Sequence, residues 1–84
     1  MNNLKQKRIK KGLSQSQLSN KANVNVRMLQ KYEQGVIDFD KANLITILKI
    51  AIGLDCKLSE LITNEELKTV LNIYESRNKY DIRE

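Results

Sequence analysis

The 84-residue chain contains no proline, tryptophan or histidine, and it has three glycines and one cysteine. So few helix-breaking residues, with only four aromatic side chains, favour an all-helical fold. Cys56 cannot form a disulfide within the chain, and without histidine or a second cysteine it has no companions for a zinc site. We interpret it as a buried small apolar residue, with a redox-sensing thiol as the alternative. Because the commonest general base is missing, we expect no enzyme, and we expect no metal or cofactor.

Long apolar runs are also missing. No run approaches the roughly 18 residues of a membrane span, and the first residues lack the pattern of a signal peptide. We therefore expect a cytoplasmic protein with no membrane partner. A chain of this length forms one small domain whose single core is marginal, so oligomerisation is a plausible source of additional stability.

The charge is unevenly distributed along the chain. Residues 1–35 carry eight basic residues and one acidic residue, a net charge of +7, whereas residues 36–84 carry seven basic and nine acidic residues, a net charge of −2. Such asymmetry fits a surface that neutralises DNA phosphates and binds less tightly as salt rises. A basic face that serves only solubility is the alternative.

Two short helices joined by a tight turn are predicted between Ser14 and Gly35. Ser14 and Gln17 have the spacing of a capping box. Asn23 enters the left-handed backbone of a tight turn at low cost. Asn25 is predicted to cap the second helix, and Gly35 to end it.

The second of these helices has two faces when its residues are placed at about 100° intervals. One arc carries Val26, Arg27, Gln30, Lys31 and Gln34, and the opposite arc carries Met28, Leu29 and Tyr32. Arginine pairs with guanine, glutamine pairs with adenine, and a short apolar group contacts a thymine methyl. The first arc is therefore predicted to read DNA bases while the second packs.

With these features the chain resembles the lambda-repressor/Cro (Xre-type) helix-turn-helix family. The matching residues lie between about positions 4 and 62: Arg8, Gly12-Leu13-Ser14-Gln15, Leu18, Leu29, Tyr32-Glu33-Gln34-Gly35, Leu48-Lys49-Ile50-Ala51, Leu54 and Leu61. The resemblance implies an all-α, lambda-repressor-like five-helix DNA-binding domain, here with an additional C-terminal helix. It also implies a salt bridge between Arg8 and Glu33.

The resemblance implies roles for several residues of this unit. Gln15 is expected to hold a DNA phosphate, and the start of the second helix is expected to meet bases and backbone. The predicted base contacts are Val26, Arg27, Gln30 and Lys31, and the predicted phosphate contacts are Gln15, Asn25, Lys41 and Asn43. The last two are included because the positive end of a helix attracts anions.

The remaining helices of the core are predicted from apolar spacing. A helix over residues 2–11 turns Leu4, Arg8 and Ile9 inward. A helix over residues 41–52, capped by Asp40 and stopped by Gly53, has an apolar arc wide enough for burial on more than one side. A short helix follows over residues 58–62. The intervening apolar loop residues, Val36, Ile37 and Phe39, fold back on the core or form an interaction patch.

The chain divides into a DNA-binding domain over residues 1–63, with its helix-turn-helix at 14–35, and a C-terminal helical segment over residues 64–84. This segment carries an apolar stripe at i, i+3, i+4 and i+7: Leu67, Val70, Leu71 and Tyr74. The stripe can close over the domain's own core or pair with a second subunit. We favour dimerisation.

These observations predict a sequence-specific regulator of transcription that binds double-stranded DNA, a repressor acting as a homodimer on an inverted repeat. The alternative is an antitoxin or anti-regulator that mainly binds a protein partner and represses its own gene. An RNA-binding role is disfavoured because the chain lacks an aromatic stacking surface. The operator, the regulated genes and any effector are not encoded in these features.

Overall fold

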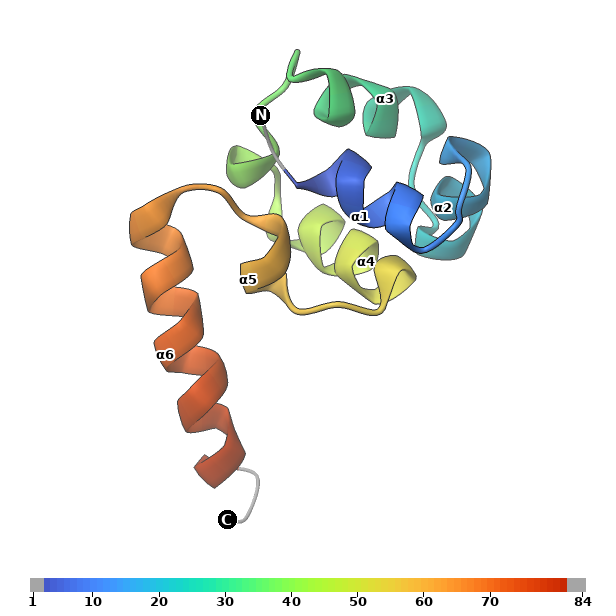
Figure 1. Ribbon diagram of the computed structural model, residues 1–84. Coiled ribbons are helices and arrows are strands. Elements are labelled where there is room, and N and C mark those ends of the chain that lie inside the picture. Colours follow the sequence, from blue (N-terminus) through green and yellow to red (C-terminus); the bar gives the residue numbers. More distant parts are fainter. Residues whose placement is uncertain (1–2, 82–84) are drawn as a thin grey trace.

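The computed structural model describes the backbone of residues 3–81 and the side chains of residues 3–77. Over this range the chain forms helices and no strand (Figure 1). In order these are α1 (Leu4–Lys10), α2 (Gln15–Ala22), α3 (Val26–Gln34), the 3-10 helix η1 (Phe39–Lys41), α4 (Leu44–Leu54), α5 (Leu58–Leu61) and α6 (Glu65–Asp81). The predicted all-α fold class is therefore confirmed.

One hydrophobic core joins the elements that precede α6. Its buried members are Leu4, Leu18, Ala22, Leu29, Tyr32, Phe39, Ile47, Ile50, Ala51, Leu54, Leu61 and Ile62. Helices α2 and α4 approach each other closely, because a Cβ atom on Gly53 would lie 3.0 Å from the Cβ of Ala22. Gly53 therefore lets two helices touch. The prediction that it stops the fourth helix is wrong, since α4 ends at Leu54 and the left-handed Asp55 (φ 52°) caps it.

The prediction of a wide buried arc on the fourth helix is also wrong. Only one face of α4 is covered, and the opposite face exposes Leu44, Ile45, Leu48 and Ile52. The helix begins later than predicted because Lys41 belongs to η1, and Asn43 caps α4 by accepting a hydrogen bond from the Thr46 N–H (3.1 Å).

The first helix is shorter than predicted and buries fewer residues. It spans Leu4–Lys10, and Asn2 of the predicted range lies outside the described residues. Leu4 and Arg8 are buried, but Ile9 is 57% exposed, so its predicted inward orientation is wrong. A helix of two turns that packs along one side buries only a narrow face, and this face includes Leu4 and Arg8 but not Ile9.

The loop after α3 folds back on the core through two of its three apolar residues. Phe39 is fully buried and meets the ring of Tyr32 edge-on, with centroids 5.5 Å apart. Ile37 is half-buried against the core, whereas Val36 is exposed. The loop is therefore anchored by Phe39.

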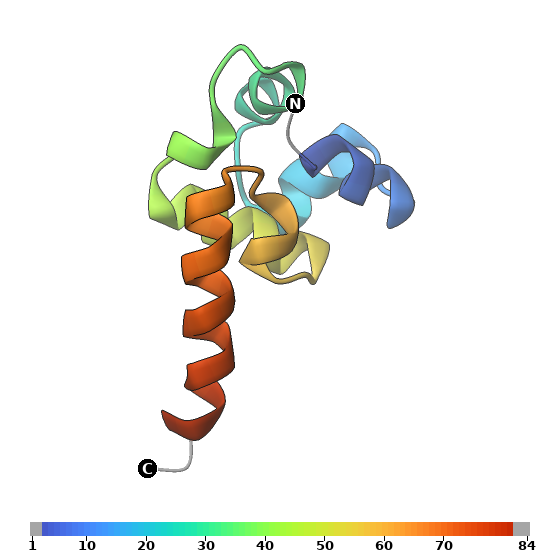
Figure 2. The same cartoon turned by 60° about the vertical axis from the view of Figure 1, so that its left-hand side comes forward.

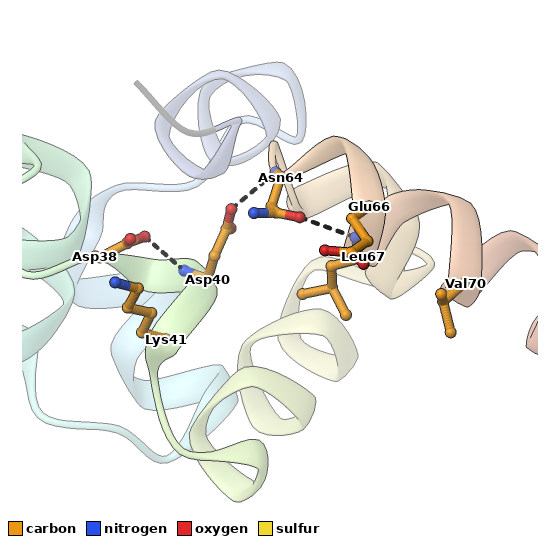
Figure 3. A pocket seen from close by; sticks show the side chains of 7 residues that line it. All are labelled: Asp38, Asp40, Lys41, Asn64, Glu66, Leu67 and Val70. Atoms are coloured by element: carbon orange, nitrogen blue, oxygen red, sulfur yellow. Dashed lines mark hydrogen bonds between the residues drawn. The ribbon is translucent and has the colours of Figure 1, made fainter.

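The last helix, α6, leaves the domain and runs away from α3 in both views (Figures 1 and 2). Asp40 fixes its start, because its Oδ2 accepts hydrogen bonds from the Thr63 hydroxyl (3.2 Å) and the Asn64 N–H (2.9 Å). The prediction that Asp40 caps the fourth helix is wrong, because Asp40 lies within η1 and Asn43 caps α4. Asn64 in turn accepts a hydrogen bond from the Leu67 N–H and caps α6 (Figure 3).

Candidate nucleic-acid interface

Local hydrogen bonds fix the α2–turn–α3 unit. Ser14 and Gln17 form the predicted capping box, with bonds of 3.0 and 2.8 Å. Asn23 is left-handed (φ 56°), as predicted for the turn, and Gly35 ends α3 with φ 77°. The Asn25 side chain accepts hydrogen bonds from the first turn of α3, at 2.8 and 3.2 Å. These predictions are confirmed. The caps and the left-handed turn together determine the direction in which α3 leaves the turn.

The face of α3 that is predicted to read DNA is accessible. Arg27 and Lys31 are exposed, and Val26 and Gln30 are partly exposed. The opposite face buries Leu29, Tyr32 and Glu33. Met28 was predicted to pack but is 41% exposed, so the buried arc is narrower than expected.

A buried ion pair ties α3 to α1. Arg8 Nε lies 2.7 Å from Glu33 Oε2, and its Nη2 lies 3.0 Å from Oε1. The third contact runs from Nη1 to the Leu13 carbonyl oxygen (2.8 Å). The hydrogen bond to Glu33 raises the pKa of Arg8. The guanidinium is thus held inside the protein and is not offered to DNA.

The two glutamines with predicted DNA contacts bind each other. Gln15 Nε2, on α2, donates to Glu33 Oε1 (3.1 Å), and Gln30 Nε2, on α3, donates to Gln15 Oε1 (3.2 Å). A chain of hydrogen bonds therefore runs from the buried ion pair to the exposed face of α3. No sequence spacing signals this contact, since the two residues lie on different helices.

The other two predicted phosphate contacts have different surroundings. The oxygen of the exposed Asn43 is used in the cap of α4. Lys41 lines a crevice of about 360 Å³ between the η1 segment and α6, with Asp38 beside it and Glu66 on the opposite side (Figure 3). Three acidic side chains line that crevice, Asp38 and Asp40 from the η1 segment and Glu66 from α6, and none of the lining residues belongs to α3.

The predicted stripe on α6 is divided between two faces. Leu67 and Leu71 pack partly against the domain's own core. Val70 and Tyr74 are 56% and 62% exposed, and Ile73 beside them is also exposed. Ile73 was missed from the sequence, although it lies three positions after Val70, which is a helical contact spacing. The Ser59 hydroxyl, on α5, also donates to Glu75 Oε1 (2.8 Å) and holds α6 in place.

Cys56 is half-buried, and burial raises the pKa of its thiol. Among the described residues no three or more His, Cys, Asp or Glu side chains form a group that could hold a metal ion. Likewise, none of the described helices is long and apolar enough to cross a membrane.

A comparison with protein families gives one match. A family model described as helix-turn-helix matches residues 4–61, which include α1 to α5. No curated protein and no solved structure matched significantly.

Proposed function

Since the chain belongs to the Cro/C1-type helix-turn-helix family of DNA-binding regulators, we propose that it is a repressor that binds an inverted-repeat operator as a homodimer. The family consists of DNA-binding regulators and not of enzymes. The observation that carries the proposal is the construction of α3. Its inner face is anchored by Leu29 and by the Glu33 ion pair, while Arg27 and Lys31 stand free on the outer face.

The proposed base contacts come from that outer face. Arg27 is suited to guanine, Gln30 to adenine, and Val26 to a thymine methyl, with Lys31 as a further base-edge donor. Asn25 and Gln15 are proposed to meet the DNA backbone beside them. Lys41 and Asn43 remain proposed phosphate contacts of lesser weight, because Lys41 shares its crevice with acidic side chains. Access to DNA requires the cytoplasmic location that we also propose.

The dimer is proposed to form through α6, which we treat as a separate segment from residue 64 onward. Val70 and Tyr74 are available for pairing, while Leu67 and Leu71 brace the helix against the domain. Because α6 runs away from α3, a two-fold axis roughly parallel to α6 keeps both α3 helices at one end of the dimer (Figures 1 and 2). Such a dimer reads half-sites about 34 Å apart, one turn of DNA.

A protein-binding role remains a second candidate. Its support is the exposed apolar face of α4, since four large aliphatic side chains in one stripe are unusual on a free surface. They are Leu44, Ile45, Leu48 and Ile52. An antitoxin or anti-regulator would cover this face with its partner.

Selection of bound duplexes from a random pool at about 150 mM salt tests the proposal. We expect enrichment of a short inverted repeat with one fixed spacing. With Arg27→Ala, the preference at one position of each half-site should be relaxed, at a cost of about 1–3 kcal/mol. If no sequence is enriched and binding disappears as salt rises, the proposal is rejected in favour of the protein-binding role.

A further inference from the structure

The hydrogen bonds around Glu33 determine which way two side-chain amides point. The Glu33 side chain is 2% exposed and is paired with Arg8. An ionised carboxylate only accepts hydrogen bonds, so a glutamine facing it must present its NH2 group. Gln15 does so, with its Nε2 3.1 Å from Glu33 Oε1.

The orientation of the Gln15 amide in turn determines how Gln30 must be oriented. Because the NH2 group of Gln15 faces Glu33, its carbonyl oxygen faces Gln30. Gln30 must then present its own NH2 group, and its Nε2 lies 3.2 Å from Gln15 Oε1. Within residues 3–77, Gln30 Oε1 has no hydrogen-bond partner, and one N–H of its Nε2 is also left over. The exposed end of Gln30 therefore offers one acceptor and one donor in a fixed order.

A fixed order of donor and acceptor matters for base recognition. Adenine presents N7 as an acceptor beside the N6 amino donor in the major groove, and one glutamine amide can match both. An amide that turns freely can present its two atoms in either order, whereas one whose NH2 group is already engaged cannot. The difference in free energy between the two amide orientations therefore becomes a difference in binding free energy between DNA sites that carry different base pairs at this position.

We propose that Gln15 is a positioning residue that orients the amide of Gln30 and so gives the regulator a preference for adenine at one position of each half-site. The inference rests on the DNA-binding function proposed above and adds a role for Gln15 beyond holding a phosphate. The buried Arg8–Glu33 pair thus contributes to sequence specificity as well as to the fold, because the Glu33 carboxylate determines which way the amides of Gln15 and Gln30 point.

The Gln15→Met variant tests this role, because methionine keeps the length of the side chain and removes both hydrogen bonds. Selection from a random duplex pool is done with the wild type, Gln30→Ala, Gln15→Met and the exposed control Gln6→Met. Gln30→Ala identifies the position that Gln30 reads. At that position the adenine preference of Gln15→Met should fall at least about fivefold, as for loss of one good bidentate contact. Gln6→Met should match the wild type.

Two selection results would overturn the proposal. In the first, Gln15→Met keeps the full adenine preference and loses affinity equally for all sequences, with a smaller salt dependence, as expected of a phosphate contact alone. In the second, Gln30→Ala leaves every position unchanged.

Side-chain amide hydrogen exchange of the free protein separates this proposal from the proposed function, because it needs no DNA. In the wild type the Gln30 amide should exchange about three to ten times more slowly than the exposed Gln34 amide. In Gln15→Met the two rates should become equal. Equal rates in the wild type would overturn the positioning role even if an operator is found. Slow exchange without any enriched sequence would instead reject the proposed function and leave the positioning intact.

Discussion

At the scale of single residues, the Arg8–Glu33 pair is the feature on which α3 depends most. Both side chains are nearly inaccessible, and two nitrogens of the guanidinium contact the two oxygens of the carboxylate. Removing one partner of a buried pair leaves the other charge uncompensated, which costs far more than the pair contributes in net stability.

We therefore expect Arg8→Met to lower the free energy of unfolding by about 3–5 kcal/mol. The double variant Arg8→Met/Glu33→Met should be more stable than Arg8→Met, because no unpaired charge remains buried. Urea denaturation measures both. Equal or greater destabilisation in the double variant would show that Glu33 is not strained by the loss of Arg8.

The partly exposed Lys7–Glu60 ion pair, between α1 and α5, predicts a pH dependence. Lys7 Nζ lies 2.6 Å from Glu60 Oε1. The hydrogen bond from Lys7 lowers the pKa of Glu60 from its ordinary value of 4.5 and raises that of Lys7 above 10.5. The folded state thus binds the Glu60 proton more weakly than the unfolded state. The contribution of Glu60 is present above pH 4.5 and is lost as the pH falls through the lowered pKa, whereas the contribution of Lys7 is lost only above pH 10.5.

Unfolding measured from about pH 6 to about pH 3 tests this linkage. The wild type should lose more stability over that range than Lys7→Met, in which the pKa of Glu60 returns toward its ordinary value. The control is Lys5→Met, which removes an exposed charge of the same helix and should behave as the wild type. A Lys7→Met profile parallel to the wild type would mean that the contact does not persist in solution.

At the scale of elements, α4 is the clearest case of a helix whose buried face could not be predicted from the sequence. Nearly every position from Leu44 to Leu54 is apolar, so periodicity cannot identify the covered face. The face is set instead by α2, which approaches α4 closely at Gly53. The resulting division leaves Ile50 buried and Ile52 74% exposed.

Two matched substitutions on this helix check that division. Ile50→Ala should cost about 2–5 kcal/mol, because it opens a cavity in the core. Ile52→Ala should change the free energy of unfolding by no more than about 0.5 kcal/mol. Denaturant titrations at low protein concentration give both values. A large loss with Ile52→Ala would mean that the exposed face of α4 is covered in solution.

The division of the α6 stripe gives a second prediction at this scale. Val70→Glu should weaken dimerisation at least tenfold, about 1.4 kcal/mol, because it places an unpaired charge in the proposed contact. Asn72→Glu, on the far side of the helix, is the control and should leave dimerisation unchanged. Sedimentation at micromolar concentrations measures both. Equal dimerisation constants would remove α6 from the interface.

What could be predicted from the sequence follows from how far each interaction reaches along the chain. The caps at Ser14 and Asn25 and the turn at Asn23 involve residues within three positions, so local rules suffice for them. Asp40 was assigned to the nearest helix but binds a segment 24 residues away. The Gln15–Gln30 bond likewise depends on how α2 crosses α3, which composition and spacing do not specify.

At the scale of the whole molecule, the DNA-binding unit and the proposed dimer contact lie at different ends. The basic first part of the chain supplies α1 to α3, and the acidic second part supplies α4 to α6. This separation keeps the acidic residues of α6 away from the phosphates that α3 would meet. In the dimer that we propose, the distance between the two α3 helices is fixed by how α6 pairs.

The most direct test of this account is the affinity for an operator whose half-site spacing is varied. Inserting five base pairs between the half-sites turns the second site about half a turn around the duplex. A rigid dimer cannot then seat both α3 helices, so affinity should fall to that of a duplex with a single half-site. Unchanged affinity would contradict the account, because it would mean that the two subunits bind independently.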